Sequence, residues 1–220
     1  MFGLSKQPNM ALVHFEEINP ESCWGIWRID ESEEELLYLL DPSKTDQAHF
    51  DTIQHPRIRL ESIASRQIVK ELTIRFGDEY QGIFKNKNGK PFLYNSPLHL
   101  SYSHTEQYAA AIIHREKPCG IDMEHMQEKM QRVSGRFLSE KELEHTGEDL
   151  QKICIYWCAK EAMYKLYNIK DTEFKGNLKV SPFQKEEHGQ IEGIIHVGSF
   201  LSKSEIHYRL FGEVVVAYCF

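Results

Sequence analysis

Two short stretches of the chain carry three carboxylates and one ammonium group whose spacing could form a single site. Asp122 and Glu124 are two residues apart and follow an apolar run at residues 109–113 and then Ile121. If this segment ends a strand, alternation puts both carboxylates on one face. Glu161 and Lys165 are four residues apart, and on a helix this spacing also gives one face. Because Mg²⁺ binds carboxylates together with phosphate oxygens, the pattern favours chemistry on a phosphate.

Each stretch alone has a simpler explanation. Glu161 and Lys165 would also fit a solvated ion pair along a helix, and Asp122 with Glu124 would fit a charged strand end. The apolar context argues for a site, because a carboxylate is costly to bury without a partner.

The order of the motifs resembles that of one known family. Gly120–Glu124 reads G-I-D-x-E, and Trp157–Lys165 reads W-x-x-K-E-x-x-x-K. These are similar to the two signature motifs of the 4′-phosphopantetheinyl transferase superfamily. Ser103–Thr105 resembles the family's S-H-(S/T) motif, and Gly89–Pro91 resembles its G-K-P motif. The length of 220 residues resembles the long, single-chain type that activates carrier domains of peptide synthetases.

The resemblance implies an activity and a set of metal ligands. The family transfers the 4′-phosphopantetheine arm of coenzyme A to a serine of an acyl- or peptidyl-carrier protein and releases adenosine 3′,5′-bisphosphate. By this resemblance, Asp122, Glu124 and Glu161 would bind Mg²⁺. Glu161 is also the candidate general base, and Lys165 would stabilise the departing diphosphate. The carrier supplies the serine, so this chain needs no nucleophile.

Candidate coenzyme contacts lie before the first signature motif. His104 matches the family histidine that contacts a coenzyme phosphate, and Ser103 stands next to it. Lys90 and Lys85 are candidates for the phosphates, and Arg59 is a candidate for the 3′-phosphate. A Ser–His nucleophile pair is disfavoured, because adjacent residues on a strand point to opposite faces.

Two other functions remain open at this stage. A metal-dependent phosphohydrolase could use the same carboxylates on a soluble nucleotide, and it would turn over without a carrier protein. A silent module that binds carriers or nucleotides is the other alternative. The presence of Asp122, Glu161 and Lys165 counts against a silent module.

Composition limits the class of protein. The net charge of −7 argues against general nucleic-acid binding. Residues 57–90 carry eight Lys or Arg against four Asp or Glu, which fits either a polyanion site or a solvated helix face. No run of about 18 apolar residues predicts a membrane span, and the N-terminus shows no signal peptide. Five scattered cysteines favour buried thiols and a cytoplasmic location.

Local patterns predict an α+β chain with two similar halves, residues 1–113 and 114–220. The resemblance adds that these are pseudo-symmetric subdomains with the active site in the cleft between them, in a protein that we expect to be a monomer. Residues 1–17 give no clear pattern. Strands are expected at 23–29, 92–94, 98–103, 108–113, 177–181, 193–198, 205–211 and 214–220. Helices are expected at 30–40, 43–60 with a break at Pro56, 60–76, 126–137, 139–145 and 150–168.

One further stripe is a candidate surface for the carrier. Met126, Met130, Val133 and Phe137 fall on one side of a helix, and basic residues stand beside them. This stripe either docks a partner helix or faces the core.

Overall fold

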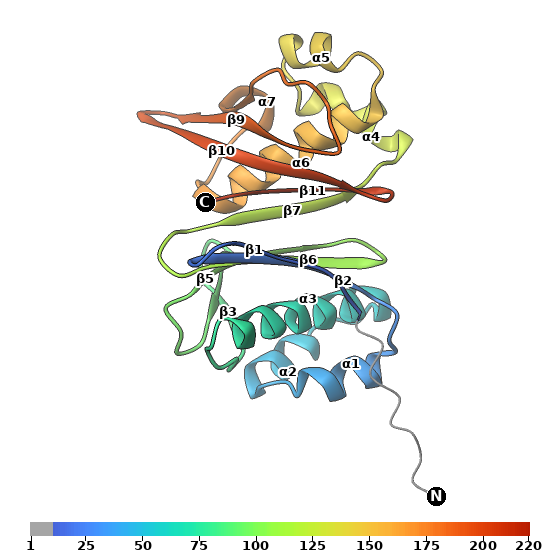
Figure 1. Ribbon diagram of the computed structural model, residues 1–220, viewed down its shortest axis with the longest axis vertical. Coiled ribbons are helices and arrows are strands. Elements are labelled where there is room, and N and C mark those ends of the chain that lie inside the picture. The colour runs from blue at the N-terminus through green and yellow to red at the C-terminus, as the bar shows by residue number, and fades with distance from the viewer. Residues whose placement is uncertain (1–10) are drawn as a thin grey trace, which may run out of the picture.

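The computed structural model describes residues 11–220, in which two antiparallel sheets lie face to face and helices cover their outer faces (Figure 1). This is the predicted α+β class. The first sheet ends with a strand at His114, and the second begins at Gly120. The chain therefore passes from one half to the other within residues 115–119.

The N-terminal half has a four-stranded sheet of order β1-β2-β6-β5. A two-stranded hairpin, β3-β4, lies beside it. Its elements are β1 (Leu12–Asn19), β2 (Ser22–Arg28), α1 (Glu33–Leu40), α2 (Lys44–Phe50), α3 (Pro56–Arg75), β3 (Ile83–Lys85), β4 (Pro91–Leu93), β5 (His99–His104) and β6 (Tyr108–His114).

The C-terminal half has a five-stranded sheet of order β7-β11-β10-β9-β8. Its elements are β7 (Gly120–His125), α4 (Glu128–Val133), the 3₁₀ helix η1 (Ser134–Arg136), α5 (Glu140–Thr146), α6 (Leu150–Tyr167), α7 (Phe174–Asn177), β8 (Leu178–Val180), β9 (His188–Val197), β10 (Phe200–Phe211) and β11 (Val214–Cys219).

The two halves share one plan. In the first, β2 pairs with β6 and β6 with β5; in the second, β7 pairs with β11 and β11 with β10. In each half a long helix, α3 or α6, follows the first of these strands along the chain and packs on the outer face of the sheet (Figure 1). The two halves therefore have a repeated topology.

Strand alternation explains why the sheets can bury both faces. On β2, Trp24 and Ile26 belong to the core between the two sheets, whereas Cys23 and Trp27 belong to the core under α3. On β7, Ile121 lies in the core between the sheets, and the next residue points to the opposite face, towards α6. The strand therefore holds the two halves together with one face and carries the candidate carboxylates on the other.

Several predicted boundaries are corrected. The first helix, expected at 30–40, begins at Glu33; Ser32 caps it, and the side chain of Ser32 accepts a hydrogen bond from the backbone N–H of Glu35. Pro56 does not interrupt a helix; it occupies the first turn of α3, where its missing N–H costs nothing. β1 was not predicted, and residues 1–10 of the uninterpreted segment lie outside the described part of the chain.

The five cysteines are all buried and free, as expected from their spacing. Within residues 11–220, no helix is both long and apolar enough to cross a membrane.

Candidate active site

β7 and α6 bring the carboxylate of Asp122 and the ammonium of Lys165 into contact. Gly120 lies so close to α6 that a side chain there would overlap the carbonyl oxygen of Ala162. This close approach puts the Nζ of Lys165 2.8 Å from Oδ1 of Asp122. The same ammonium donates to the carbonyls of Ile121 at 3.0 Å and Tyr102 at 3.3 Å. Lys165 therefore joins α6 to strands of both halves.

The edge of the first sheet completes the contacts of Asp122. The hydroxyl of Ser103 donates to Oδ1 of Asp122 at 2.8 Å, and the hydroxyl of Ser101 accepts the N–H of Ile121 at 3.1 Å. Both serines lie on β5, two residues apart and therefore on one face. Asp122 is 6% exposed, and its carboxylate is held by one hydroxyl and one ammonium.

His104 points away from Ser103, as alternation predicts. Its Nδ1 lies 3.2 Å from Oε2 of Glu61 on α3, and Arg57 donates to the other oxygen of Glu61 at 2.9 Å. Burial lowers the pKa of His104, and the charge of Lys165 lowers it further, while Glu61 opposes both. This geometry agrees with the sequence interpretation that disfavoured a Ser–His nucleophile pair.

Glu161 and Glu124 have carboxyl groups that are partly removed from water. Burial raises the pKa of Glu161 to about 7, and the charges of Asp122 and Glu124 also raise it, against the effect of Lys165. The pKa of Glu124 is raised as well, first by burial. The carboxylates therefore repel one another, as expected for groups that share a site.

Side-chain positions do not yet form a closed metal cage. Among residues 11–220, no three His, Cys, Asp or Glu side chains surround a common point closely enough to hold an ion. Oδ1 of Asp122 is occupied by Lys165, and Oε1 of Glu124 accepts the N–H of His125 at 3.1 Å. The chemistry of the three carboxylates still suits Mg²⁺, because all are hard oxygen ligands with excess negative charge.

A hollow of ≈ 190 Å³ lies between the halves, next to this cluster. Lys85 and Lys90 line it from the hairpin side, and Lys165 lines it from α6. Lys90 donates from Nζ to the carbonyls of Lys165 at 3.1 Å and Leu166 at 2.7 Å, and burial lowers its pKa. The Nζ of Lys85 stands 5.9 Å from the ring centroid of Tyr102. Lysine side chains from both halves line this small hollow, and such a concentration of positive charge suits a phosphate or diphosphate.

The C-terminal half matches a known family. Residues 118–219 match the model of the 4′-phosphopantetheinyl transferase superfamily. This is the superfamily that the sequence motifs resemble. No curated protein matches the chain. Among solved structures, a holo-(acyl-carrier-protein) synthase from Bacillus anthracis in complex with CoA (3′,5′-ADP) is similar, with a TM-score of 0.36 and 20% identity over 42% of this chain and 92% of that chain.

The match to the phosphopantetheinyl transferase superfamily covers only part of the site. Asp122, Glu124, Glu161 and Lys165 lie inside the matched residues, whereas His104 and the lysines of the hairpin precede them. The N-terminal contribution to the site therefore rests on geometry and on the shorter motifs.

Arg59 is not brought to the hollow with the other candidates. Its Nε lies 2.8 Å from Oε1 of Glu33 on α1, and its Nη1 donates to the carbonyl of Phe50 at 3.4 Å. Two residues on a helix differ by about 200° in direction, so Arg57 faces His104 when Arg59 faces α1. Sequence reasoning placed Arg57 in the basic segment but missed its role beside Glu61, although their i,i+4 spacing gave a signal.

The stripe after β7 contributes mainly to the core. Met130 and Phe137 are buried, and Met126 and Val133 are partly buried against the same cluster. Phe137 also borders a groove of ≈ 540 Å³, which is lined by Val133, Arg136, Phe137, Trp157, Glu173, Phe174 and Lys175.

Proposed function

We propose that this protein transfers the 4′-phosphopantetheine arm of coenzyme A to a serine of an acyl- or peptidyl-carrier protein. The observation that carries the proposal is the contact of Lys165 with Asp122 at the edge of a hollow that also holds Lys85 and Lys90. Negative groups suited to a cation and positive groups suited to phosphates stand next to each other, as phosphoryl transfer requires.

In the proposed reaction, the serine oxygen of the carrier forms a bond to the phosphorus that bears the pantetheine arm. The bond between this phosphorus and the bridging diphosphate oxygen breaks, and adenosine 3′,5′-bisphosphate leaves. Glu161 would accept the serine proton, directly or through water. Burial raises its pKa to about 7 in the metal-free protein, and a bound cation would lower this pKa again, which favours proton transfer through water.

Asp122, Glu124 and Glu161 would hold Mg²⁺. When bound, the ion would neutralise diphosphate charge and polarise phosphorus. Two features support this assignment: the pKa of Glu124 and that of Glu161 are both raised, and Asp122 contributes to both shifts.

Phosphate binding falls to the lysines and to His104. Lys85 and Lys90 approach the hollow from the N-terminal half, and Lys165 approaches from the C-terminal half. His104 lies on the other face of β5 from Ser103 and is placed by Glu61. Both halves of one chain supply groups to the site, which supports the long single-chain type acting as a monomer.

We also propose that the carrier docks on the groove beside α6. Its rim carries the exposed Arg136, and Lys175 lines it, in a chain whose net charge is −7. Carrier domains usually present an acidic helix next to their serine, so a local basic rim would offset the overall repulsion.

Mass spectrometry of apo-carrier proteins tests the transfer directly. After incubation with coenzyme A and Mg²⁺, the carrier should gain the mass of one phosphopantetheine arm. The reaction without carrier, with chelator, or with the Glu161→Gln variant serves as the control. Unmodified carriers together with phosphate release from soluble nucleotides would favour a phosphohydrolase instead.

A further inference from the structure

Lys160 precedes Glu161 on α6, yet its ammonium is completely buried. Its Nζ donates to the carbonyl of Phe137 at 2.7 Å, to Oε2 of Glu142 at 2.8 Å and to the carbonyl of Phe174 at 3.1 Å. An ammonium has three donors, and here all three are used. Lys160 therefore faces inward and is not available to a substrate.

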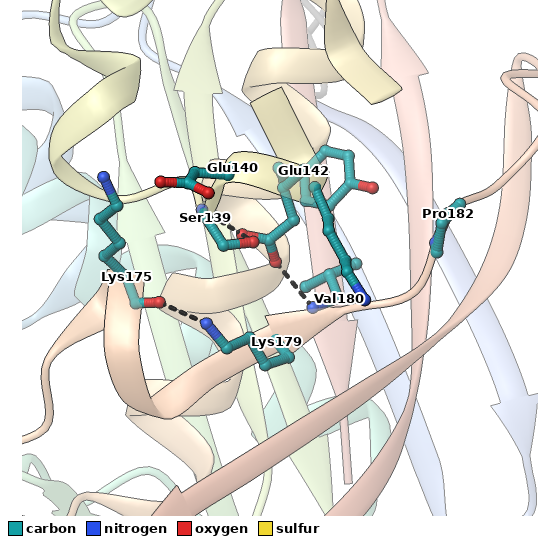
Figure 2. Close-up of a pocket in the computed structure, with 9 residues that line it drawn as sticks. Ser139, Glu140, Glu142, Lys175, Lys179, Val180 and Pro182 are labelled. Carbon is teal, nitrogen blue, oxygen red and sulfur yellow. Dashed lines mark hydrogen bonds between the residues drawn. The ribbon is translucent and has the colours of Figure 1, made fainter. Parts of the chain in front are cut away.

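The carboxylate of Glu142 also accepts hydrogen bonds from groups other than Lys160. Its Oε2 accepts the N–H of Ser139 at 2.7 Å and the hydroxyl of Ser139 at 2.9 Å, and its Oε1 accepts the N–H of Val180 at 3.0 Å (Figure 2). The ion pair thus connects α6 to the start of α5, to β8 and to two backbone carbonyls.

The N-terminal half contains a matching ion pair. Asp46 caps the start of α2 through Ser43, accepts the N–H of Ile83 at 3.3 Å and pairs with Arg66 of α3 at 2.8 Å. In both halves, an acid in a capping box binds a base on the long helix and a backbone N–H in the strand after that helix. This repetition indicates a structural device rather than a catalytic one.

The two ion pairs differ in the other groups to which the basic side chain, Arg66 or Lys160, donates hydrogen bonds. Arg66 makes its other hydrogen bonds to Ser62 of its own helix, and its guanidinium lies over the ring of Phe50. Lys160 donates instead to the carbonyls of Phe137 and Phe174, whose rings both contact Trp157, at centroid distances of 4.9 Å and 5.6 Å. These rings line the groove described above.

We propose that Lys160 is a positioning residue that fixes the separation of Phe137 and Phe174, and so the shape of the groove that receives the carrier protein. This inference rests on the proposed function for its substrate. It assigns Lys160 to carrier recognition, although Lys160 touches neither carrier nor coenzyme.

The kinetic test uses Lys160→Met, which keeps side-chain length and removes the charge and the donors. The matched control is Arg66→Met, which breaks the equivalent ion pair in the other half. Lys160→Met should raise the KM for the carrier about tenfold, as expected for the loss of hydrogen bonds from a charged group, and leave the KM for coenzyme A unchanged. Arg66→Met should change neither KM at a temperature where both variants are folded.

A second variant protects the test against misfolding. Lys160→Met leaves Glu142 as a buried charge without its ammonium partner, which can destabilise the fold. The double variant Lys160→Met with Glu142→Gln removes both charges, and it should show the same rise in the KM for the carrier. An unchanged carrier KM in a folded variant, or equal rises for both substrates, would overturn the proposal.

Hydrogen exchange tests the positioning without any enzymatic activity. Backbone amides of residues 134–139 and 174–180 should exchange about tenfold faster in Lys160→Met than in Arg66→Met, because the walls of the groove lose their common anchor. Equal exchange rates in these segments would contradict the role of Lys160. If the wild-type protein modifies no carrier but the exchange difference appears, the proposed function fails and the positioning of the groove stands.

Discussion

The two halves of the molecule use one architecture but differ in charge next to their long helices. On α3, Arg66 of the buried ion pair is followed by Gln67; on α6, Lys160 is followed by Glu161. Gln67 is 2% exposed, and within residues 11–220 its Oε1 has no hydrogen-bond partner. At corresponding places, one half therefore buries a neutral amide and the other partly buries a carboxyl group with a raised pKa.

The strands that precede these long helices, β2 and β7, also differ in charge. Gly25 of β2 packs against Ile68 of α3, and Gly120 of β7 packs against Ala162 of α6. Two residues further on, the N-terminal half has Trp27 in its core, where the C-terminal half has Asp122. The comparison teaches that the fold does not need these carboxylates. Their desolvation is a cost that only the C-terminal half bears, which is the pattern expected of a functional site.

The largest expected effect comes from replacing Glu161 by glutamine, the residue type that the N-terminal half has at the corresponding place, Gln67. Glu161→Gln should reduce transfer by at least about 10²-fold, because a general base and a proposed metal ligand are lost together.

Burial raises the pKa of Glu161, so the folded protein binds an extra proton between the ordinary pKa and about 7. Stability without metal should therefore fall as pH rises through this window, and Glu161→Gln should be the more stable protein at pH 8. Carrier modification and denaturant unfolding at several pH values measure the two effects.

Gln67→Glu is the control in the other half. Gln67 donates to Oε1 of Glu71 at 3.3 Å, so a carboxylate at position 67 would be buried next to a like charge. This variant should lose stability at neutral pH and gain no activity. If Glu161→Gln retained wild-type transfer, Glu161 would be neither base nor ligand.

Asp122→Ala should abolish the Mg²⁺-dependent part of coenzyme A binding. The carboxylate now interacts with Lys165 and Ser103, so the variant removes a proposed metal ligand and releases the ammonium. Calorimetric titration of coenzyme A with and without chelator measures this. Equal binding in both conditions for the wild type would exclude a metal at this place.

The contribution of the N-terminal half is expected to be binding rather than bond making. His104→Ala and Lys90→Ala should each weaken coenzyme A binding by about 1.5–3 kcal/mol, or about tenfold to a hundredfold, with less change in the KM for the carrier. Lys90→Ala also frees two carbonyls at the end of α6, so its loss of stability should be measured in parallel. Unchanged KM values for coenzyme A in both variants would move the phosphate site away from the hollow.

Charge reversal on the outer side of the C-terminal half should act on the carrier alone. Arg132 and Arg136 are exposed, and Arg136 borders the groove. Arg132→Glu with Arg136→Glu should raise the KM for the carrier several-fold and leave coenzyme A binding unchanged. The effect should shrink at high salt as charges are screened. Equal effects on both substrates would place the docking surface elsewhere.

The smallest effect is expected at Arg59. Its ion pair with Glu33 is partly exposed, so Arg59→Ala should cost at most about 1 kcal/mol of stability. Coenzyme A and its dephospho analogue should be affected alike. Weaker binding of coenzyme A alone in Arg59→Ala would instead support a contact between Arg59 and the 3′-phosphate.

Local spacing predicted the parts of the site that depend on one element. Asp122 and Glu124 share a face of β7, and Glu161 and Lys165 both interact with Asp122, because strand and helix periodicities follow from the backbone. The family motifs supplied the connection between these elements.

Contacts between distant segments could not be predicted in the same way. The hydrogen bond from Ser103 to Asp122 joins strands of different sheets, and its formation depends on how the two sheets pack. Lys160 lies about 100° from Glu161 around the helix, so its position next to Glu161 in the sequence does not place it in the site. Two of its three partners are backbone carbonyls, at Phe137 and Phe174, and any residue type provides a carbonyl. The side-chain sequence therefore carries no signal for them.

Lys90 makes the two halves thermodynamically interdependent. Its ammonium belongs to the N-terminal half, yet two of its donors bind the carbonyls of Lys165 and Leu166 in the last turn of α6, and within residues 11–220 its third donor has no hydrogen-bond partner. An anion that binds this third donor also favours the charged form that holds the helix end. By reciprocity, whatever orders the last turn of α6 increases affinity for the anion, and the anion in turn orders that turn. Anion binding at Lys90 and the ordering of the helical turn that carries Lys165 are thus coupled in a single equilibrium.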